Sequence, residues 1–148
     1  MKNINLKEYV RRRNGAALGA KGSLKNMLRR SLGAGKFSGF WHYWNPIWGY
    51  YLGKYIFKPL RNYFSKTAAI FLTFLISGLI HDLVVSVIYF KIVVIVTPWF
   101  VLMSFGLILS NKMGVYVKST NWYYRALINI SYIGICLFIA LKFREMYA

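Results

Sequence analysis

Apolar residues form three long runs in the second half of the chain, at about 66–90, 92–110 and 126–141. A helix rises ~1.5 Å per residue and needs about 20 residues to cross ~30 Å of hydrocarbon. The first two runs reach that length, and the third does so when the two tyrosines before it, which suit a membrane interface, are included. The pattern therefore predicts three transmembrane helices, at about 66–90, 92–110 and 123–141.

A different pattern precedes the first apolar run, where aromatic residues recur at intervals of three and four. This spacing predicts a helix at about 46–58 with one aromatic face, and basic residues gather on another side of it. Asn45 followed by Pro46 suits an N-cap and a first helical turn, and Pro59 should stop or bend the helix. We expect this helix to lie in the cytoplasmic membrane interface. Its expected apolar face comprises Trp41, Trp44, Trp48, Tyr51, Leu52, Tyr55 and Ile56.

Residues 1–36 mix ten basic side chains with five glycines, so any helix there should be short or broken. We expect a basic cytoplasmic arm held at the lipid headgroups. The chain is thus predicted to be an all-α integral membrane protein with two parts. These are the basic N-terminal arm, 1–36, and a membrane domain, 37–148, made of the interfacial helix and about three transmembrane helices.

Charge and composition agree with a membrane location. The 148 residues are 57% hydrophobic and carry a formal net charge of +17, a combination that is unusual for a small soluble domain. Nucleic acid is the competing polyanionic partner, but no recognition module is apparent among the charges, so we expect none. Of the 20 basic residues, 17 fall on the side of the N-terminus when three spans are drawn. The N-terminus should then be cytoplasmic and the C-terminus outside, in a cytoplasmic (inner) membrane.

The chain offers little material for a metal site or a disulfide. Its two histidines and three acids are scattered, so we expect no bound metal. Its single cysteine, Cys136, lies in an apolar run and should be a small packing residue.

The most informative polar residue is His81, which lies inside the first predicted span with Asp82 after it. An ionisable group inside a transmembrane helix is costly and is a functional-site hypothesis by default. The alternative is a hydrogen bond from His81 to a neighbouring helix. Successive side chains of a helix point about 100° apart, so a direct catalytic pair of His81 with Asp82 is not expected. Ser77 and Gly78, one turn earlier, should leave room for a ligand beside the imidazole.

Two blocks of sequence together resemble the membrane-bound O-acyltransferases. The first is Phe40-Trp41-His42-Tyr43-Trp44-Asn45-Pro46 with its continuation through Leu60, and the second is Ser77-Gly78-Leu79-Ile80-His81-Asp82 in an apolar helix. In that family, a polar element in an aromatic block is followed by a histidine inside a hydrophobic helix. The resemblance covers about residues 37–90.

The resemblance implies transfer of an acyl group from acyl-CoA to a hydroxyl acceptor, with no permanently bound cofactor. By the same resemblance, His81 is the general base and Asn45 orients or polarises the donor. Lys54, Lys58 and Arg61 are candidates for binding the phosphates of coenzyme A, although basic residues flanking a span would give the same pattern. Asn45 also has the simpler role of a helix cap, and His42 is expected to be structural.

The family typically has many more transmembrane helices than the three predicted here, and the chain resembles only its C-terminal catalytic part. The missing walls of an active site would come from other copies or from a partner membrane protein. The alternative function is a non-enzymatic small membrane subunit, or a degenerate relative, that packs in a larger complex.

Overall fold

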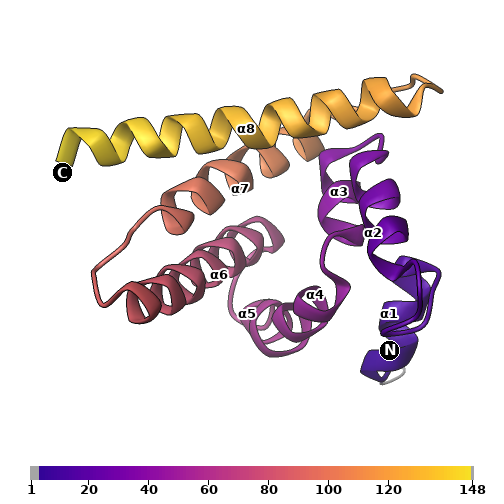
Figure 1. The fold of residues 1–148 in the computed structure, drawn as a ribbon, viewed down its shortest axis with the longest axis horizontal. Coiled ribbons are helices and arrows are strands. Elements are labelled where there is room, and N and C mark those ends of the chain that lie inside the picture. The colour runs from indigo at the N-terminus through magenta and orange to yellow at the C-terminus, as the bar shows by residue number, and fades with distance from the viewer. Residues whose placement is uncertain (1–3, 148) are drawn as a thin grey trace.

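The computed structural model describes residues 4–147, which form helices without any strand (Figure 1). This confirms the all-α prediction. The elements are α1 (Leu6–Asn14), α2 (Ser23–Leu32), α3 (Phe37–Tyr43), α4 (Pro46–Leu52), the π-helix η1 (Gly53–Phe57), α5 (Lys58–Leu60), α6 (Lys66–Tyr89), α7 (Val96–Lys112) and α8 (Trp122–Tyr147).

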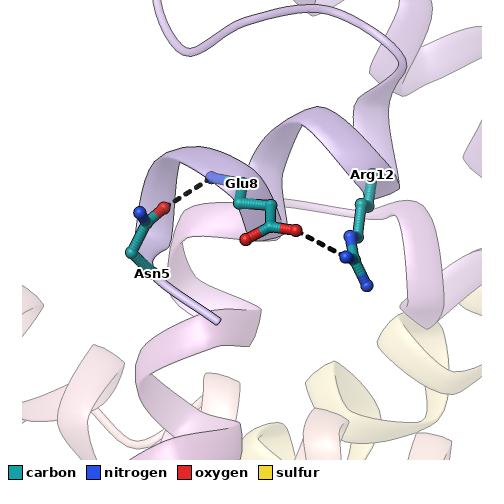
Figure 2. A network of polar contacts seen from close by, with 3 residues as sticks. All are labelled: Asn5, Glu8 and Arg12. Atoms are coloured by element: carbon teal, nitrogen blue, oxygen red, sulfur yellow. Dashed lines mark hydrogen bonds and ion pairs between the residues drawn. The ribbon is translucent and has the colours of Figure 1, made fainter. Parts of the chain in front are cut away.

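The basic N-terminal segment folds as two short helices, as its glycines predicted. The side chain of Asn5 caps α1 by accepting a hydrogen bond from the Glu8 backbone N–H at 2.8 Å, and the Glu8 carboxylate pairs with Arg12 (Figure 2). The helix ends at Gly15, whose φ of +74° lies in the left-handed region that glycine adopts without strain. Helix α1 packs on α4, while α2 packs on α3 and α8.

Helices α6, α7 and α8 form a layered unit in which α7 lies in the middle (Figure 1). Helix α7 accordingly buries Met103, Ser104 and Leu107. Two hydrogen bonds join it to α8, from the Trp99 indole to the Ile133 carbonyl at 3.1 Å and from the Tyr132 hydroxyl to the Leu102 carbonyl at 3.4 Å.

Two helices are long and apolar enough to cross a membrane, Lys66–Tyr89 and Trp122–Met146. They contain the first and third predicted spans, and the third extends beyond its predicted end. The second predicted span is not confirmed, because α7 begins four residues late and has only 17 residues. Such a helix is about 26 Å long, shorter than the usual hydrocarbon core. Pro98 lies in its first turn, where a missing N–H breaks no helical hydrogen bond, so the proline marks the later start.

The aromatic helix also differs from its prediction. Residues 46–60 are helical almost throughout, but as α4, η1 and α5 in succession. The π-helix lies just before Pro59, whose ring cannot fit a regular helical turn, and the helical run ends at Leu60. Trp41 and Trp44 do not continue the face of α4. Trp41 lies on α3 and Trp44 ends it, so the expected single aromatic face is wrong.

Candidate active site

The chain turns sharply at Asn45, between α3 and α4. Asn45 has a φ of +37°, in the left-handed region that asparagine tolerates better than most residues. Its side-chain oxygen accepts a hydrogen bond from the backbone N–H of Trp48 at 3.2 Å, and Pro46 occupies the first helical position. The predicted N-cap is therefore confirmed, and it fixes the asparagine side chain at the start of α4.

His81 is held in one orientation by its own helix. Its Nδ1 lies 2.6 Å from the Ser77 carbonyl oxygen. A carbonyl oxygen can only accept a hydrogen bond, so Nδ1 carries the proton and, in the neutral ring, Nε2 has the free lone pair. The imidazole packs edge-on against Trp48, with ring centroids 5.5 Å apart, and against Phe100 of α7 at 5.4 Å.

A hydrogen bond ties α4 to α6 beside His81. The Trp48 indole N–H donates to the Ser77 hydroxyl at 3.0 Å. Ser77 thus accepts from Trp48 through its hydroxyl and from His81 through its carbonyl. Trp48 is also the residue whose backbone N–H is capped by Asn45. This chain of contacts sets the position of Asn45 relative to His81.

Asn45 and His81 line the same cavity, of about 160 Å³. Ligand pockets usually measure about 300–1,000 Å³, so this cavity suits the reacting groups of a substrate better than a whole coenzyme. The structure thus brings the two predicted catalytic residues, 36 positions apart, to one place. The other lining residues are Trp41, Trp44, Trp48, Gly49, Leu52, Thr73, Phe74, Ser77 and Phe100.

Several residues that line this cavity have polar groups with unused hydrogen-bonding capacity within residues 4–147. His81 Nε2 accepts no hydrogen bond, and the Asn45 side-chain amide donates none. The Trp41 indole N–H is buried without an acceptor, and the indole N–H of Trp44 makes no hydrogen bond within the described residues either. A buried donor without a partner costs about 1–3 kcal/mol, so a ligand that supplied an acceptor would gain from it.

Asp82 faces away from this cavity and caps α7. One carboxylate oxygen accepts from the backbone N–H groups of Ile95 and Val96, at 3.1 and 2.8 Å, and the other accepts from Thr97 at 2.8 Å. Asp82 is 5% exposed, and it satisfies donors that the start of a helix leaves unpaired. It is therefore a structural residue with no hydrogen bond to His81, as the helical geometry predicted.

Gly78 does not leave room for a ligand, which corrects the expectation from sequence. A Cβ atom at this position would lie 2.6 Å from the Thr97 Cα atom. The glycine instead lets the start of α7 approach α6 closely. Ser77 does line the cavity, and its hydroxyl and carbonyl oxygens accept hydrogen bonds from Trp48 and His81.

The basic residues proposed for coenzyme A lie elsewhere. Lys54, Lys58 and Arg61 are exposed on η1, α5 and the turn that follows, and none lines the cavity. The Lys54 ammonium lies over the Tyr55 ring at 5.2 Å, and Arg61 donates to the Phe64 carbonyl at 2.6 Å.

His42 is exposed on α3 and is not a lining residue of the His81 cavity. Within the described residues, no three His, Cys, Asp or Glu side chains come together as metal ligands would. The lone Cys136 is buried in α8.

Several residues of the site were not recognised from sequence as parts of it. The aromatic pattern predicts a membrane-facing surface for Trp41 and Trp48, and hydropathy makes Phe100 one apolar residue of a predicted span. The helical period could group the tryptophans, but nothing in it indicated that they would face His81. Whether the Trp41 indole N–H finds a hydrogen-bond acceptor depends on which groups the other helices bring near it.

No protein-family model, curated protein or solved structure matches this chain.

Proposed function

We propose that this protein is an integral membrane O-acyltransferase that moves an acyl group from acyl-CoA to a hydroxyl acceptor. The observation that supports this most is the cavity that Asn45 and His81 share, together with the free Nε2 lone pair that the Nδ1 hydrogen bond leaves on His81. A neutral imidazole has nearly the right basicity to take a hydroxyl proton at physiological pH.

In the proposed step, His81 Nε2 takes the proton of the acceptor hydroxyl as its oxygen attacks the thioester carbonyl carbon. A carbon–oxygen bond forms, the carbon–sulfur bond breaks, and the leaving thiolate takes the proton from the imidazolium. The products are an ester and a free thiol, so protons balance. The Asn45 amide and the Trp41 indole N–H would stabilise the carbonyl oxygen as it gains negative charge.

We further propose that α6, α7 and α8 all cross the membrane, with the N-terminus cytoplasmic. Helix α7 is short for this role but packs between the two longer helices. Trp48 bonds to Ser77, the twelfth residue of α6, about 16 Å along that helix from its start. Helix α4 would then begin within the membrane beside α6, and the basic segment after it would reach the cytoplasmic interface.

A non-enzymatic role as a subunit of a larger membrane complex is the second candidate. The observation that favours it is the large exposed apolar surface, together with the small volume of the cavity. On α6, the large apolar side chains Leu83, Val84, Val87 and Ile88 are all more than half exposed. Lipid covers such faces in a spanning protein, but a partner helix would cover them equally well.

Turnover of labelled acyl-CoA by the purified protein tests the proposal. Replacing His81 with Ala should lower transfer at least about 100-fold, because general base catalysis contributes that much. Leu79→Ala is the matched control, since Leu79 is 52% exposed on the same helix. It should transfer at the wild-type rate. Equal activity in His81→Ala and the wild type would sink the assignment. The absence of both donor binding and turnover, with or without candidate partners, would favour the subunit role.

A further inference from the structure

The C-terminal end of α2 is fastened to the start of α8. The Trp122 indole N–H donates to the Arg29 carbonyl at 2.9 Å. The Asn129 side-chain amide donates to the carbonyls of Leu32 and Ala34, at 2.8 and 2.9 Å. Figure 1 shows the two helices meeting at the end of α8 that is remote from the C-terminus. This junction is therefore built from specific contacts between distant parts of the chain.

The junction gathers three arginines around one pocket of about 520 Å³. Arg29 and Arg30 come from α2, and Arg125 comes from the first turn of α8. Arg30 uses one N–H on the Arg13 carbonyl, at 2.7 Å. The Nε atom of Arg125 is buried and has no hydrogen-bond partner within residues 4–147. Positive side chains that line one pocket repel one another, and an anion bound between them would relieve this repulsion.

The protein has no side-chain carboxylate to spare for this pocket. It contains three acids, and each is already engaged: Glu8 with Arg12 (Figure 2), Asp82 with the start of α7, and Glu145 with Lys142. The carbonyl groups at the end of α2, which could otherwise attract the arginines, accept from Trp122 and Asn129 instead. Within residues 4–147, no side-chain carboxylate is therefore placed to compensate these arginines, and a bound anionic ligand could do so.

An apolar groove adjoins the arginine pocket and shares Arg29 and Trp122 with it. The groove measures about 660 Å³, and its wall includes Leu24, Leu28 and Tyr123. Leu24 is 66% exposed and Tyr123 is 77% exposed, so this apolar wall is open to whatever surrounds the protein. A cationic pocket beside an apolar groove matches a ligand with an anionic head and a hydrocarbon chain.

We propose that this composite site binds an anionic phospholipid from the surrounding membrane. The phosphate lies among Arg29, Arg30 and Arg125, because guanidinium groups bind phosphate oxygens in bidentate fashion. One acyl chain follows the groove along α2. Trp122 and Tyr123 open a candidate membrane span, where aromatic residues mark the headgroup level, and this sets the pocket at the depth of lipid phosphates. The proposal rests on the membrane location argued above and is independent of acyl transfer.

Lipid binding by the purified full-length chain tests this site. We would measure the affinity for phosphatidylglycerol in detergent micelles by native mass spectrometry, with phosphatidylcholine as the neutral comparison. Arg125→Gln should weaken phosphatidylglycerol binding about ten-fold, the expected cost of one charge-assisted contact. Arg144→Gln, which removes the same charge near the other end of α8, should leave binding unchanged.

A second variant keeps the test clear of misfolding. Leu24→Asn alters an exposed side chain, so the fold should persist while the chain-binding groove becomes polar. It should weaken binding of phosphatidylglycerol but not of inorganic pyrophosphate. Equal binding by Arg125→Gln and Arg144→Gln would overturn the proposal, and so would equal affinity for the two lipids. Binding of pyrophosphate as tight as that of phosphatidylglycerol would point instead to a soluble phosphorylated ligand. Acyl transfer measured on the same preparations separates failure of this site from failure of the His81 assignment.

Discussion

His81 and Asp82 are neighbours on α6 but belong to two regions that differ in how much of their hydrogen-bonding capacity is used. Asp82 faces the start of α7, and its two oxygens accept three backbone N–H groups. His81 faces the aromatic cavity, where one ring nitrogen is used and the other is free. A polar residue in an apolar helix is structural when its partners are all supplied by the fold. It is a candidate for chemistry when capacity is left over beside a cavity.

The Asp82 region should respond most strongly to mutation. Asp82→Ala removes three hydrogen bonds and leaves three N–H groups at the start of α7 without acceptors. We expect a loss of about 3 kcal/mol or more in the free energy of unfolding, measured in detergent. Glu145→Ala is the control, because it removes an acid from an exposed ion pair and should cost less than about 1 kcal/mol. Similar losses for both variants would contradict the capping role.

The close contact between α6 and α7 gives a second, smaller effect. Gly78→Ala introduces a Cβ atom that would lie 2.6 Å from the Thr97 Cα atom. We expect a destabilisation of about 1–3 kcal/mol by overpacking, measured by denaturant or thermal unfolding. Gly134→Ala on α8 meets no atom within 4 Å and should be neutral or stabilising by up to about 1 kcal/mol, through higher helix propensity. An equally stable Gly78→Ala protein would show that the two helices are not this close.

The link between α4 and α6 predicts a modest effect on the cavity side. Trp48→Phe keeps an aromatic ring beside His81 but loses the hydrogen bond to the Ser77 hydroxyl, at a cost of about 1 kcal/mol. Trp44→Phe is the matched change, because Trp44 lines the same cavity without a side-chain hydrogen bond within the described residues. A greater loss of stability in Trp44→Phe than in Trp48→Phe would argue against the α4–α6 link.

The smallest expected effect concerns His42, outside the predicted spans. His42 is exposed as a whole residue, but neighbouring atoms partly desolvate its imidazole. This desolvation lowers the pKa of His42 below its ordinary value of 6.5, and the Arg13 guanidinium lowers it further. The unfolded chain then binds this proton more readily. The stability that the folded state gains from keeping His42 neutral is fully present above pH 6.5. It is lost as the pH falls through the lower folded-state pKa. An NMR titration should give a midpoint below 6.5, and Arg13→Gln should raise it. A midpoint at or above 6.5 would contradict the folded environment of His42.

Local features of this fold were predictable from the sequence, whereas contacts between helices were not. The N-cap at Asn45, the short N-terminal helices and the helix around His81 follow from hydrogen bonding and periodicity within a few residues. The partner of Asp82 lies 13 residues away across a turn that the sequence placed too early. Because apolar residues continue through 92–95, hydropathy alone could not locate the start of α7.

The candidate site was predictable only in part, for the same reason. His81 stood out as a costly ionisable group, and Asn45 followed from the resemblance and its capping position. The wall that joins them depends on Trp48 meeting Ser77, a contact between helices that periodicity does not encode. The arginine pocket at α2 and α8 also joins residues about a hundred positions apart. Charge counting therefore detects the excess of basic residues but not the place where they gather.

We propose that Asn45 and His81 form one catalytic site. The most direct measurement is the rate of acyl transfer from labelled acyl-CoA by the wild type, Asn45→Ala, His81→Ala and the double variant. Residues that act as a unit give non-additive losses, so we predict that the double variant is about as slow as His81→Ala alone. Independent losses that multiply in the double variant, or a His81→Ala protein with full activity, would contradict the claim.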